Sequence, residues 1–360
     1  MTTTTTGLTP LGWDDAVAAA FDEMTADFVL VPGRVGRVDR GRVTVHTAEG
    51  PVLALVRLPA GSLLEDQPTT GDWVGLERRD DGDVVRAVLP RRSAIVRRAA
   101  GERSDAQVMA ANLDHVLVAV PFETRLRLSS IERYLVIAWE SGARPLIVLT
   151  KADLAYDPDA ARAEVEAAAP GVTVLVASAE TGEGIADVAE ALALGTTALV
   201  GQSGAGKSTL VNVLAGRAVQ AVTDTRQDGK GRHTTTAREL VPLAGGGVLL
   251  DTPGLRSIGL QEDGEGVART FPDIEELTSA CRFNDCSHEC EPGCAVREAI
   301  ADGRLEERRW ASRQKLQREA EWIAMRSDPA SRAKARKRWA ATDRAAQARA
   351  ALKRGQDPFA

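Results

Sequence analysis

Cysteine is scarce in this chain of 360 residues, and all four cysteines lie between positions 281 and 294. The disulfide framework of a secreted protein spreads its cysteines through the fold, so this crowding favours a reducing compartment and a local metal site. Long hydrophobic runs are absent as well, since the longest apolar stretches fall well below the roughly 18 residues of a membrane span. The N-terminus shows no basic leader followed by an apolar stretch. We therefore expect a cytoplasmic protein with no membrane partner.

Positive charge is outweighed by negative charge, since the formal net charge is −6 at neutral pH. The excess acid lies in residues 1–27 and 99–295, whereas residues 28–98 and 296–360 are net basic. This asymmetry favours contact of the basic parts with nucleic acid. A solvated, Arg-rich helix is the alternative explanation of the C-terminal part. With 44% apolar residues, the chain is long enough for two or three domains with cores of their own.

The pattern of the chain changes at position 28. Residues 1–27 predict an acidic helical extension. Residues 28–98 hold five short apolar runs separated by Gly, Pro and Asp, which predict a small OB-fold β-barrel. Residues 99–112 carry no strong pattern and are expected to form a linker.

Two groups of arginines distinguish the predicted barrel. They are Arg34, Arg37, Arg40 and Arg42, and then Arg91, Arg92, Arg97 and Arg98. The aromatic residues of this region are only Phe28 and Trp73, so stacking on bases would be limited. Contact with RNA would therefore favour phosphates and helix shape. A purely structural barrel is the alternative.

Residues 113–268 alternate apolar, strand-like runs with amphipathic, helix-like runs. Such alternation predicts a parallel, doubly wound α/β sheet with helices on both faces. Residues 269–360 begin with the segment that holds the cysteines and continue as a helix-rich, basic region. The chain is thus expected to be multidomain.

A glycine-rich turn between a predicted strand and a predicted helix matches the phosphate-binding loop pattern, reading GQSGAGKS from Gly201 to Ser208. Its glycines permit a tight turn with N–H groups facing phosphate oxygens, and the helix directs the positive end of its dipole at them. Lys207 would neutralise the β- and γ-phosphates, and the Ser208 hydroxyl would ligate Mg²⁺. The predicted nucleotide-binding residues here are Gly201, Gln202, Ser203, Gly204, Ala205, Gly206, Lys207, Ser208 and Thr209.

The segment DTPG, residues 251–254, directly follows another apolar strand. Asp251 at the end of that strand can reach Mg²⁺ through water, and the N–H of Gly254 can contact the γ-phosphate. Alone, this tetrapeptide is an ordinary turn sequence. Next to a phosphate-binding loop, it indicates an enzyme that binds a nucleoside triphosphate.

The segment TKAD, residues 150–153, also ends an apolar strand. The Asp153 carboxylate can accept from the ring N–H and the exocyclic amine of guanine together, which predicts GTP as the nucleotide. The stem of Lys151 would pack over the base and the phosphate-binding loop, and Thr150 stands where GTPases usually carry Asn. The predicted base-binding residues are Thr150, Lys151, Ala152 and Asp153, with Ser178 and Ala179 adding a backbone N–H for guanine O6.

The order of these motifs differs from that of ordinary GTPases, because TKAD precedes GQSGAGKS and DTPG. A parallel sheet places all of these loops at one edge, so joining the old termini and opening the chain elsewhere can preserve the site. The sequence therefore predicts a circularly permuted P-loop α/β GTPase domain over residues 113–268.

This motif order, with a barrel before it and a Cys/His segment after it, resembles the circularly permuted GTPases of the RsgA/YjeQ family. GDWV at 71–74, LPRRS at 89–93 and GRHTTT at 231–236 also fall in the family order. The resemblance implies an OB-fold, a GTPase domain and a C-terminal zinc-binding helical domain. It further implies a role in late maturation of the small ribosomal subunit, with the subunit and its rRNA as partners. We expect a monomer.

Five possible soft metal ligands lie in the segment CRFNDCSHECEPGC. A structural tetrahedral Zn²⁺ site takes four, so one ligand is surplus. The family's Cys, Cys, His, Cys pattern maps onto Cys281, Cys286, His288 and Cys294, which leaves Cys290 over. A four-cysteine site with His288 outside is the alternative.

The loop 224–238 lies between the phosphate-binding helix and DTPG, where a switch that closes on the γ-phosphate belongs. One threonine of the run 234–236 is expected to ligate Mg²⁺, and Thr235 is the preferred candidate. Leu255 stands where signalling GTPases carry a Gln that positions water, so intrinsic hydrolysis is expected to be slow. His233 is then the candidate for orienting the water, with contact to RNA as its alternative role.

Together these observations predict a GTP hydrolase that uses GTP/GDP, Mg²⁺ and one structural Zn²⁺. It would dock on the small ribosomal subunit through its barrel and C-terminal helices. Two alternatives remain: a nucleotide-gated RNA-binding chaperone whose hydrolysis is incidental, and a GTPase that delivers metal through its Cys/His segment.

Overall fold

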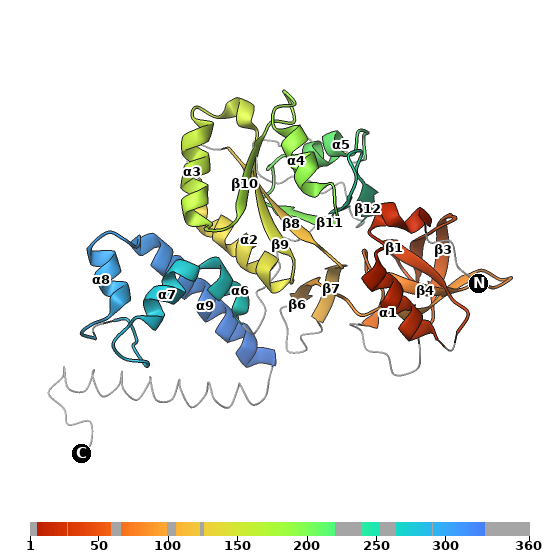
Figure 1. Cartoon of the computed structure of the whole chain (residues 1–360), viewed down its shortest axis with the longest axis horizontal. Helices are drawn as coiled ribbons and strands as arrows, with labels where there is room; N and C mark the ends of the chain where they lie inside the picture. The colour runs from red at the N-terminus through yellow and green to blue at the C-terminus, as the bar shows by residue number, and fades with distance from the viewer. Residues whose placement is uncertain are drawn as a thin grey trace, which may run out of the picture.

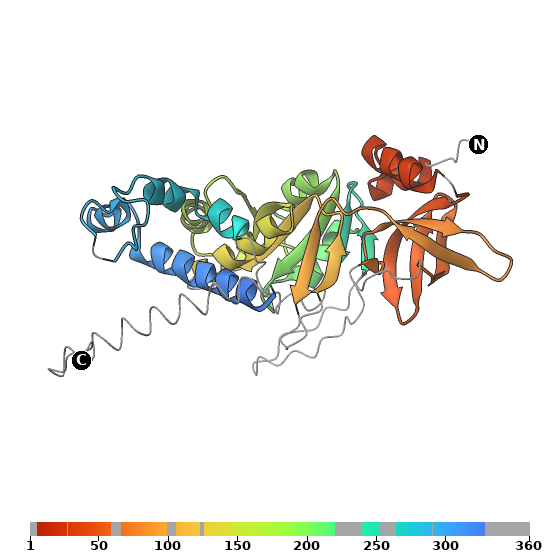
Figure 2. The same ribbon diagram turned by 90° about the horizontal axis from the view of Figure 1, so that it is seen from below.

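A computed structural model describes residues 6–26, 28–58, 66–98, 106–122, 126–219, 239–251, 264–289 and 291–327 of the chain (Figure 1). A β-barrel, an α/β sheet and a group of C-terminal helices follow one another along the long axis of the molecule. Figure 2 shows the N-terminal helix lying over one side of the barrel. Within the described ranges, no helix has both the length and the apolarity needed to cross a lipid bilayer.

The N-terminal extension packs on the barrel. It consists of a short 3-10 helix, η1 (Thr6–Leu11), and of α1 (Asp15–Thr25). Asp14 caps α1, because its Oδ1 accepts a hydrogen bond of 2.8 Å from the N–H of Val17. Trp13 packs edge-on against Trp73 of the barrel, with 5.1 Å between the ring centres. The helix predicted for this part of the chain is therefore present.

The barrel is a closed ring of five strands. They are β1 (Val31–Asp39), β2 (Arg42–Thr47), β3 (Gly50–Val56), β4 (Trp73–Glu77) and β5 (Asp83–Val88). The ring closes through antiparallel pairing of β1 with both β2 and β4, while β3 and β5 pair in parallel. Alternate valines and leucines of these strands, among them Val35, Val45 and Leu76, fill the interior. This is the predicted OB-like barrel.

The α/β sheet carries five parallel strands. They are β8 (His115–Pro121), β9 (Arg144–Thr150), β10 (Thr173–Ala177), β11 (Thr196–Gly201) and β13 (Val248–Asp251), in the order β10-β9-β8-β11-β13. The antiparallel strand β12 (Glu239–Pro242) pairs with β13 on one side and with β1 of the barrel on the other, where Arg37 lies opposite Glu239. The barrel and the α/β sheet therefore share one continuous 11-stranded sheet.

Helices cover both faces of this sheet. On one face, α2 (Leu128–Glu140) and α3 (Pro158–Ala168) pack on residues such as Val116 and Ile147. On the other, α4 (Ile185–Leu192) and α5 (Lys207–Leu214) pack on residues such as Leu117 and Val148. Neighbouring residues of one strand thus face opposite layers, as expected for a doubly wound sheet.

Part of the segment predicted as a linker is a strand instead. Residues 106–111 form β7 (Ala106–Ala111), which pairs antiparallel with β6 (Ala94–Arg98). Met109 and Ala110 of this hairpin are buried in the main core, which explains its regular structure. The prediction failed because the run AQVMAA has no alternation of polar and apolar residues.

Four helices form the described C-terminal part. They are α6 (Glu265–Thr270), α7 (Pro272–Ser279), α8 (Ala295–Ala301) and the long α9 (Glu307–Ser327). Of these, α6 and α9 pack against α2. A buried charge network fixes α9, because Arg309 donates to Glu132 of α2 (3.2 Å) and to Asp273 of α7 (2.7 Å). Arg133 and Glu319 add a two-pronged ion pair with distances of 2.6 and 2.7 Å. The helical C-terminal part is thus held firmly to the α/β domain.

Candidate functional site

The predicted nucleotide motifs converge at one edge of the sheet. Strand β9 ends at Thr150, β11 at Gly201 and β13 at Asp251, and all three run parallel. Loops that follow the carboxyl ends of parallel strands form the ligand crevice of open α/β sheets. The permuted order of the motifs therefore still produces one site.

The phosphate-binding loop joins β11 to α5. Gly201 has a φ of +141°, and a Cβ there would lie 2.3 Å from the carbonyl oxygen of Ala119, so only glycine fits. Gly206 caps α5 in the left-handed conformation with φ of +73°. The Lys207 ammonium lies inside the loop, 2.9 Å from Gly201 O and 2.5 Å from Gln202 O. The loop thus presents a helix N-terminus and a cation at one point.

Ser203 of this loop is exposed, while Gly204, Ser208 and Thr209 are half-buried and Ala205 is fully buried. Ser208 and Thr209 lie in the first turn of α5, where backbone N–H groups have no partner within the helix. The residues predicted to bind phosphate and Mg²⁺ thus lie together in the structure.

Thr150 connects the base-reading motif to the phosphate-binding loop. Its Oγ1 donates a hydrogen bond of 2.8 Å to the carbonyl oxygen of Ala205. Lys151 adopts a left-handed backbone conformation with φ of 62°. Its Cε lies 3.9 Å from the position that a Cβ on Gly206 would take, so its stem runs beside the loop. Ala152 is buried and begins the 3-10 helix η3 (Ala152–Leu154), which carries Asp153.

Ser178 orients the carboxylate of Asp153. Its Oγ accepts hydrogen bonds from the N–H groups of Glu180 (3.3 Å) and Thr181 (3.2 Å). A hydroxyl has only one proton to donate, and this one goes to Oδ1 of Asp153 at 2.5 Å. The Asp153 side chain is itself exposed, so the oriented carboxylate is open to a base.

Of the two residues predicted to offer an N–H to guanine O6, Ala179 is the better candidate. The N–H of Ser178 donates to the carbonyl oxygen of Glu183 at 2.9 Å, which closes the loop after β10. Sequence reasoning missed this role of Glu183, because a backbone carbonyl leaves no signal in the residue type.

Several predicted residues are not described. Gly254, His233, Thr235 and Cys290 lie outside the described ranges, as do Leu255 and the rest of the predicted switch. For Asp251, the end of β13 is described and the side chain is not. Their predicted roles therefore stay predictions.

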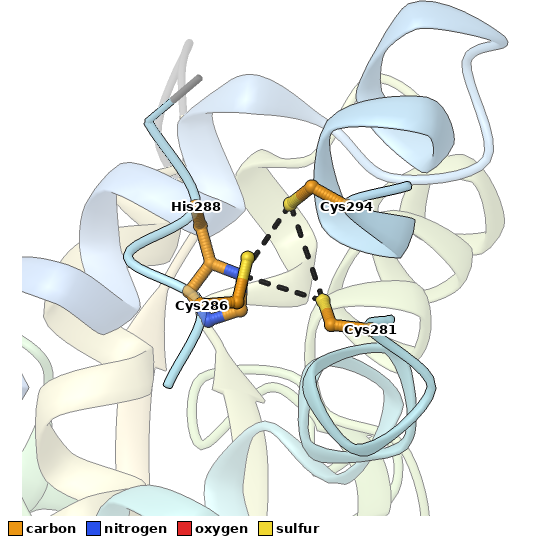
Figure 3. Close-up of side chains that lie close together, drawn as sticks. All are labelled: Cys281, Cys286, His288 and Cys294. Atoms are coloured by element: carbon orange, nitrogen blue, oxygen red, sulfur yellow. Dashed lines mark hydrogen bonds between the residues drawn. The ribbon is translucent and has the colours of Figure 1, made fainter. Parts of the chain in front are cut away.

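The structure brings Cys281, Cys286, His288 and Cys294 together, with all four ligand atoms within 4.8 Å of one another (Figure 3). The Sγ atoms of Cys281 and Cys294 lie 4.0 Å apart, and Nδ1 of His288 lies 3.6 and 3.5 Å from them. A tetrahedral Zn²⁺ with bonds of about 2.0 to 2.3 Å separates its ligands by roughly these distances, so the four residues fit that ion.

Local structure and charge prepare these side chains for a cation. Cys294 caps α8, and the ring of His288 packs edge-on against Trp310 of α9, with 5.3 Å between ring centres. Desolvation lowers the pKa of His288, which favours the neutral ring that binds metal. Desolvation raises the pKa of Cys286 to about 11, and hydrogen bonds with the thiols of Cys294 and Cys281 act in the same direction. A bound cation would reverse that effect. Sequence reasoning missed Trp310, which is distant in sequence.

The barrel arginines correct one prediction. Arg34 is 1% exposed and cannot contact RNA. Arg91 pairs with Asp72 at 2.8 Å, and Arg92 pairs with Asp14 of the N-terminal extension at 2.7 Å. Much of the predicted basic surface therefore serves the fold. The exposed members of the first group include Arg40 and Arg42, which flank the turn between β1 and β2.

A cavity of about 1030 Å³ lies apart from the nucleotide site. It lies between the N-terminal extension and strands β4 and β5, with Met24, Leu30, Arg57 and Leu89 in its wall. Phe28 is 67% exposed at its margin, whereas Trp73 is buried. Of the two aromatic residues noted in the barrel sequence, Phe28 is thus the one open to a partner.

The barrel, the permuted motifs at one sheet edge and the C-terminal Cys₃His cluster define a circularly permuted P-loop GTPase. The family model described as RsgA GTPase matches residues 88–261. A Streptomyces coelicolor protein named small ribosomal subunit biogenesis GTPase RsgA is 50% identical over 358 residues, which cover 97% of this chain and 96% of that protein. Its namesake from Opitutus terrae is 43% identical, covering 92% and 95% of the two chains. The chain belongs to the RsgA family of GTPases.

Solved structures agree with this family. The crystal structure of YjeQ from Thermotoga maritima matches with a TM-score of 0.60 and 28% identity, covering 80% of this chain and 97% of that one. The structure of YloQ, titled a circularly permuted GTPase, shares the fold with a TM-score of 0.58 at 23% identity, covering 83% and 97%. The predicted class of fold and the predicted GTPase activity are therefore confirmed.

Proposed function

We propose that this chain hydrolyses GTP while bound to the small ribosomal subunit, that it acts in late maturation of the subunit, and that the subunit stimulates hydrolysis. The observation that carries the proposal is the joint site, where Thr150 hydrogen-bonds the phosphate-binding loop and Ser178 orients the base-reading Asp153. Relatives that match over nearly the whole chain carry the name small ribosomal subunit biogenesis GTPase, which supports the choice of partner.

In the proposed site, Asp153 selects guanine, and Lys207 with the amides of the phosphate-binding loop holds the phosphates. Ser208, Asp251 and Thr235 would hold Mg²⁺, which supplies charge neutralisation for the leaving phosphate when bound. Gly254 would contact the γ-phosphate, and His233 would orient the attacking water. GTP would then bind in this site as the substrate, and GDP would be the product held there.

We assign the Cys281, Cys286, His288 and Cys294 cluster to one structural Zn²⁺. Its ligands support the assignment, because Cys294 is buried and caps a helix, and His288 is held by Trp310. A site that delivers metal needs exchangeable ligands, so this packing disfavours the metal-delivery alternative. Bound Zn²⁺ would supply folding energy to a loop-rich segment.

The proposed protein is a cytoplasmic monomer that docks on rRNA. The exposed turn at Arg40 and Arg42 and the net basic residues 296–360 are the proposed phosphate contacts. Arg34, Arg91 and Arg92 are left out of this surface because they are used within the fold.

Steady-state GTP hydrolysis with and without purified small subunits tests the proposal. Slow turnover that the subunits accelerate supports it. Subunit binding that depends on GTP, with turnover unchanged by subunits, would instead establish the nucleotide-gated RNA-binding chaperone. Absence of any subunit binding at low salt would reject both.

A further inference from the structure

A buried arginine joins three separate segments of the chain. Nε of Arg34 donates to the carbonyl oxygen of Gly71 at 3.2 Å, and Nη2 donates to that of Asn112 at 3.2 Å. Nη1 donates to the carbonyl oxygen of Leu11. The guanidinium also lies over the ring of Trp73, 4.9 Å from its centre. One side chain therefore links the N-terminal extension, the barrel and the segment that enters the α/β sheet.

Burying this charge is costly, because a guanidinium loses its hydration when it leaves water. Desolvation lowers the pKa of Arg34 to about 10, while the charges of Asp114 and Asp72 oppose that effect. The group stays charged at neutral pH. A methionine would fill similar space without that cost, but it could not fix the directions of three carbonyl groups.

One of the three acceptor segments, the one that contains Asn112, continues toward the nucleotide site. Asn112 is held in the left-handed conformation with φ of 55°, and its Nδ2 donates to Gly71 O at 3.2 Å. Two residues further on, Oδ2 of Asp114 accepts from the N–H of Thr196 at 2.6 Å. Thr196 is the first residue of β11, whose last residue, Gly201, begins the phosphate-binding loop.

Strand β1 meets the α/β sheet at a second point. Arg37, three residues after Arg34, lies opposite Glu239 of β12. Strand β12 pairs with β13, the strand that ends at Asp251. Strand β1 therefore contributes two attachments between the barrel and the sheet, by side-chain hydrogen bonds at Arg34 and by strand pairing at Arg37.

We propose that Arg34 is a positioning residue, which fixes the angle of the barrel against the α/β sheet so that a subunit held by the barrel can stimulate GTP hydrolysis. This inference rests on the proposed function. Arg34 touches neither the nucleotide motifs nor the exposed barrel turn. Its loss should therefore uncouple subunit binding from hydrolysis rather than abolish either one.

The test compares Arg34→Met with Arg78→Met, an arginine on the same barrel that forms exposed ion pairs with Glu49 and Asp83. For Arg34→Met, we expect unchanged GTP affinity and basal turnover and a stimulation by small subunits that falls about tenfold, the scale of one lost charged hydrogen bond. Arg78→Met should keep full stimulation. Arg34→Lys keeps the positive charge but lacks the several N–H donors of the guanidinium, so it should show a smaller loss of stimulation. It replaces Arg34→Met in the test if that protein does not fold.

A disulfide between β1 and β12 separates positioning from a general loss of stability. The opposed residues Arg37 and Glu239 are replaced by cysteine in the Arg34→Met background. Opposed Cα atoms of antiparallel strands lie about 4.5 to 5.5 Å apart, within the span of a disulfide. Stimulation should return when the disulfide forms and disappear on reduction, with zinc content checked in both states.

Two results would overturn the inference. One is full stimulation of the Arg34→Met and Arg34→Lys proteins. The other is an Arg34→Met protein in which the disulfide has formed and thermal unfolding matches that of the wild type, but stimulation has not returned. If the wild-type protein is not stimulated at all, the proposed function has failed instead.

Discussion

The hydroxyl of Thr150 donates a hydrogen bond of 2.8 Å to the backbone carbonyl of Ala205, and this bond ties the base-reading motif to the phosphate-binding loop. The two residues are 55 positions apart in sequence. Thr150 ends β9 and Ala205 lies in the loop after β11, and these two strands end at the same edge of the sheet. Thr150 stands where most GTPases have Asn. In this chain, the hydroxyl at that position connects the base-reading motif to the phosphate-binding loop.

Removing that hydroxyl should weaken nucleotide binding. Thr150→Val keeps the shape of the side chain and loses the hydroxyl donor, so the buried carbonyl of Ala205 loses this hydrogen bond. We expect GTP and GDP affinity to fall about tenfold, corresponding to about 1.4 kcal/mol. Thr150→Ser is the matched control and should bind nearly as well as the wild type. Titration with a fluorescent GDP analogue measures both, and equal affinities for the Val and Ser proteins would contradict the role.

Changing Asp153 should change the preferred base. In Asp153→Asn, an amide N–H₂ replaces one of the two acceptors that face guanine, so GTP affinity should fall by at least about tenfold. Xanthosine triphosphate, which carries an oxygen at the position of the exocyclic amine, should then bind better than GTP. Competition between the two nucleotides measures the preference. A retained preference for GTP would exclude Asp153 from the base site.

Each ligand of the Cys₃His cluster should be required for bound metal. Cys281→Ala, Cys286→Ala, His288→Ala and Cys294→Ala should each lose about one zinc per chain and destabilise the C-terminal helices, since structural zinc supplies folding energy. Cys290→Ala is the control and should retain zinc. Metal analysis by mass spectrometry, together with thermal unfolding, tests this. Zinc that survives His288→Ala and is lost in Cys290→Ala would indicate the four-cysteine site instead.

The buried network at Arg309 should stabilise the contact between α9 and the α/β domain. Arg309→Met leaves Glu132, which is fully buried, with one of its two arginine partners. The expected loss is about 3 kcal/mol of unfolding free energy, the lower end for a broken buried ion pair. Arg304→Met, which removes an exposed pair with Asp302, should leave the free energy of unfolding almost unchanged. Denaturant unfolding measures both, and equal losses would contradict the burial argument.

The same network predicts a response to acid. Desolvation raises the pKa of Asp273, but hydrogen bonds and charge from Arg309 outweigh it and hold the pKa below its usual value of 3.8. A lowered pKa in the folded state contributes stability above the unfolded value, and this contribution is lost as the pH falls through the folded value. Stability should therefore drop below about pH 3.8, and Asp273→Asn should remove this part of the drop. An unchanged acid profile in Asp273→Asn would refute the assignment.

The sequence predicted which loops meet at one edge of the sheet better than it predicted which arginines are exposed. Gly201, Lys207 and Asp153 carry local patterns with a direct chemical meaning, and parallel strands bring such loops together whatever their order in the chain. The role of Arg34 could not be predicted in this way. Its type favours a solvent-facing phosphate contact, whereas the structure buries it under carbonyl groups from Leu11, Gly71 and Asn112. Such long-range partners leave no local signal.

The hairpin at β6 and β7 shows a second limit of the sequence. AQVMAA, residues 106–111, lacks the alternation of a half-exposed strand, because Met109 and Ala110 are both buried. The segment offered five candidate zinc ligands, and the family resemblance selected Cys281, Cys286, His288 and Cys294. The structure brings these four together, while Cys290 lies outside the described residues. His288 packs against Trp310, 22 positions later in the chain.

The proposed coupling to the ribosome predicts a particular dependence on salt. Leu255 provides no group that positions water, so the isolated protein should hydrolyse GTP slowly, and small subunits should accelerate it. Contacts between arginines and phosphates release counterions, so the stimulation should fall steeply between about 50 and 200 mM salt. GTP affinity of the free protein should change little over this range.

His233→Ala should keep GTP and subunit binding and lose most of the stimulation, whereas Arg42→Met should bind subunits more weakly with a shallower salt dependence. Turnover that subunits leave unchanged at low salt would reject the coupling and the proposed function with it.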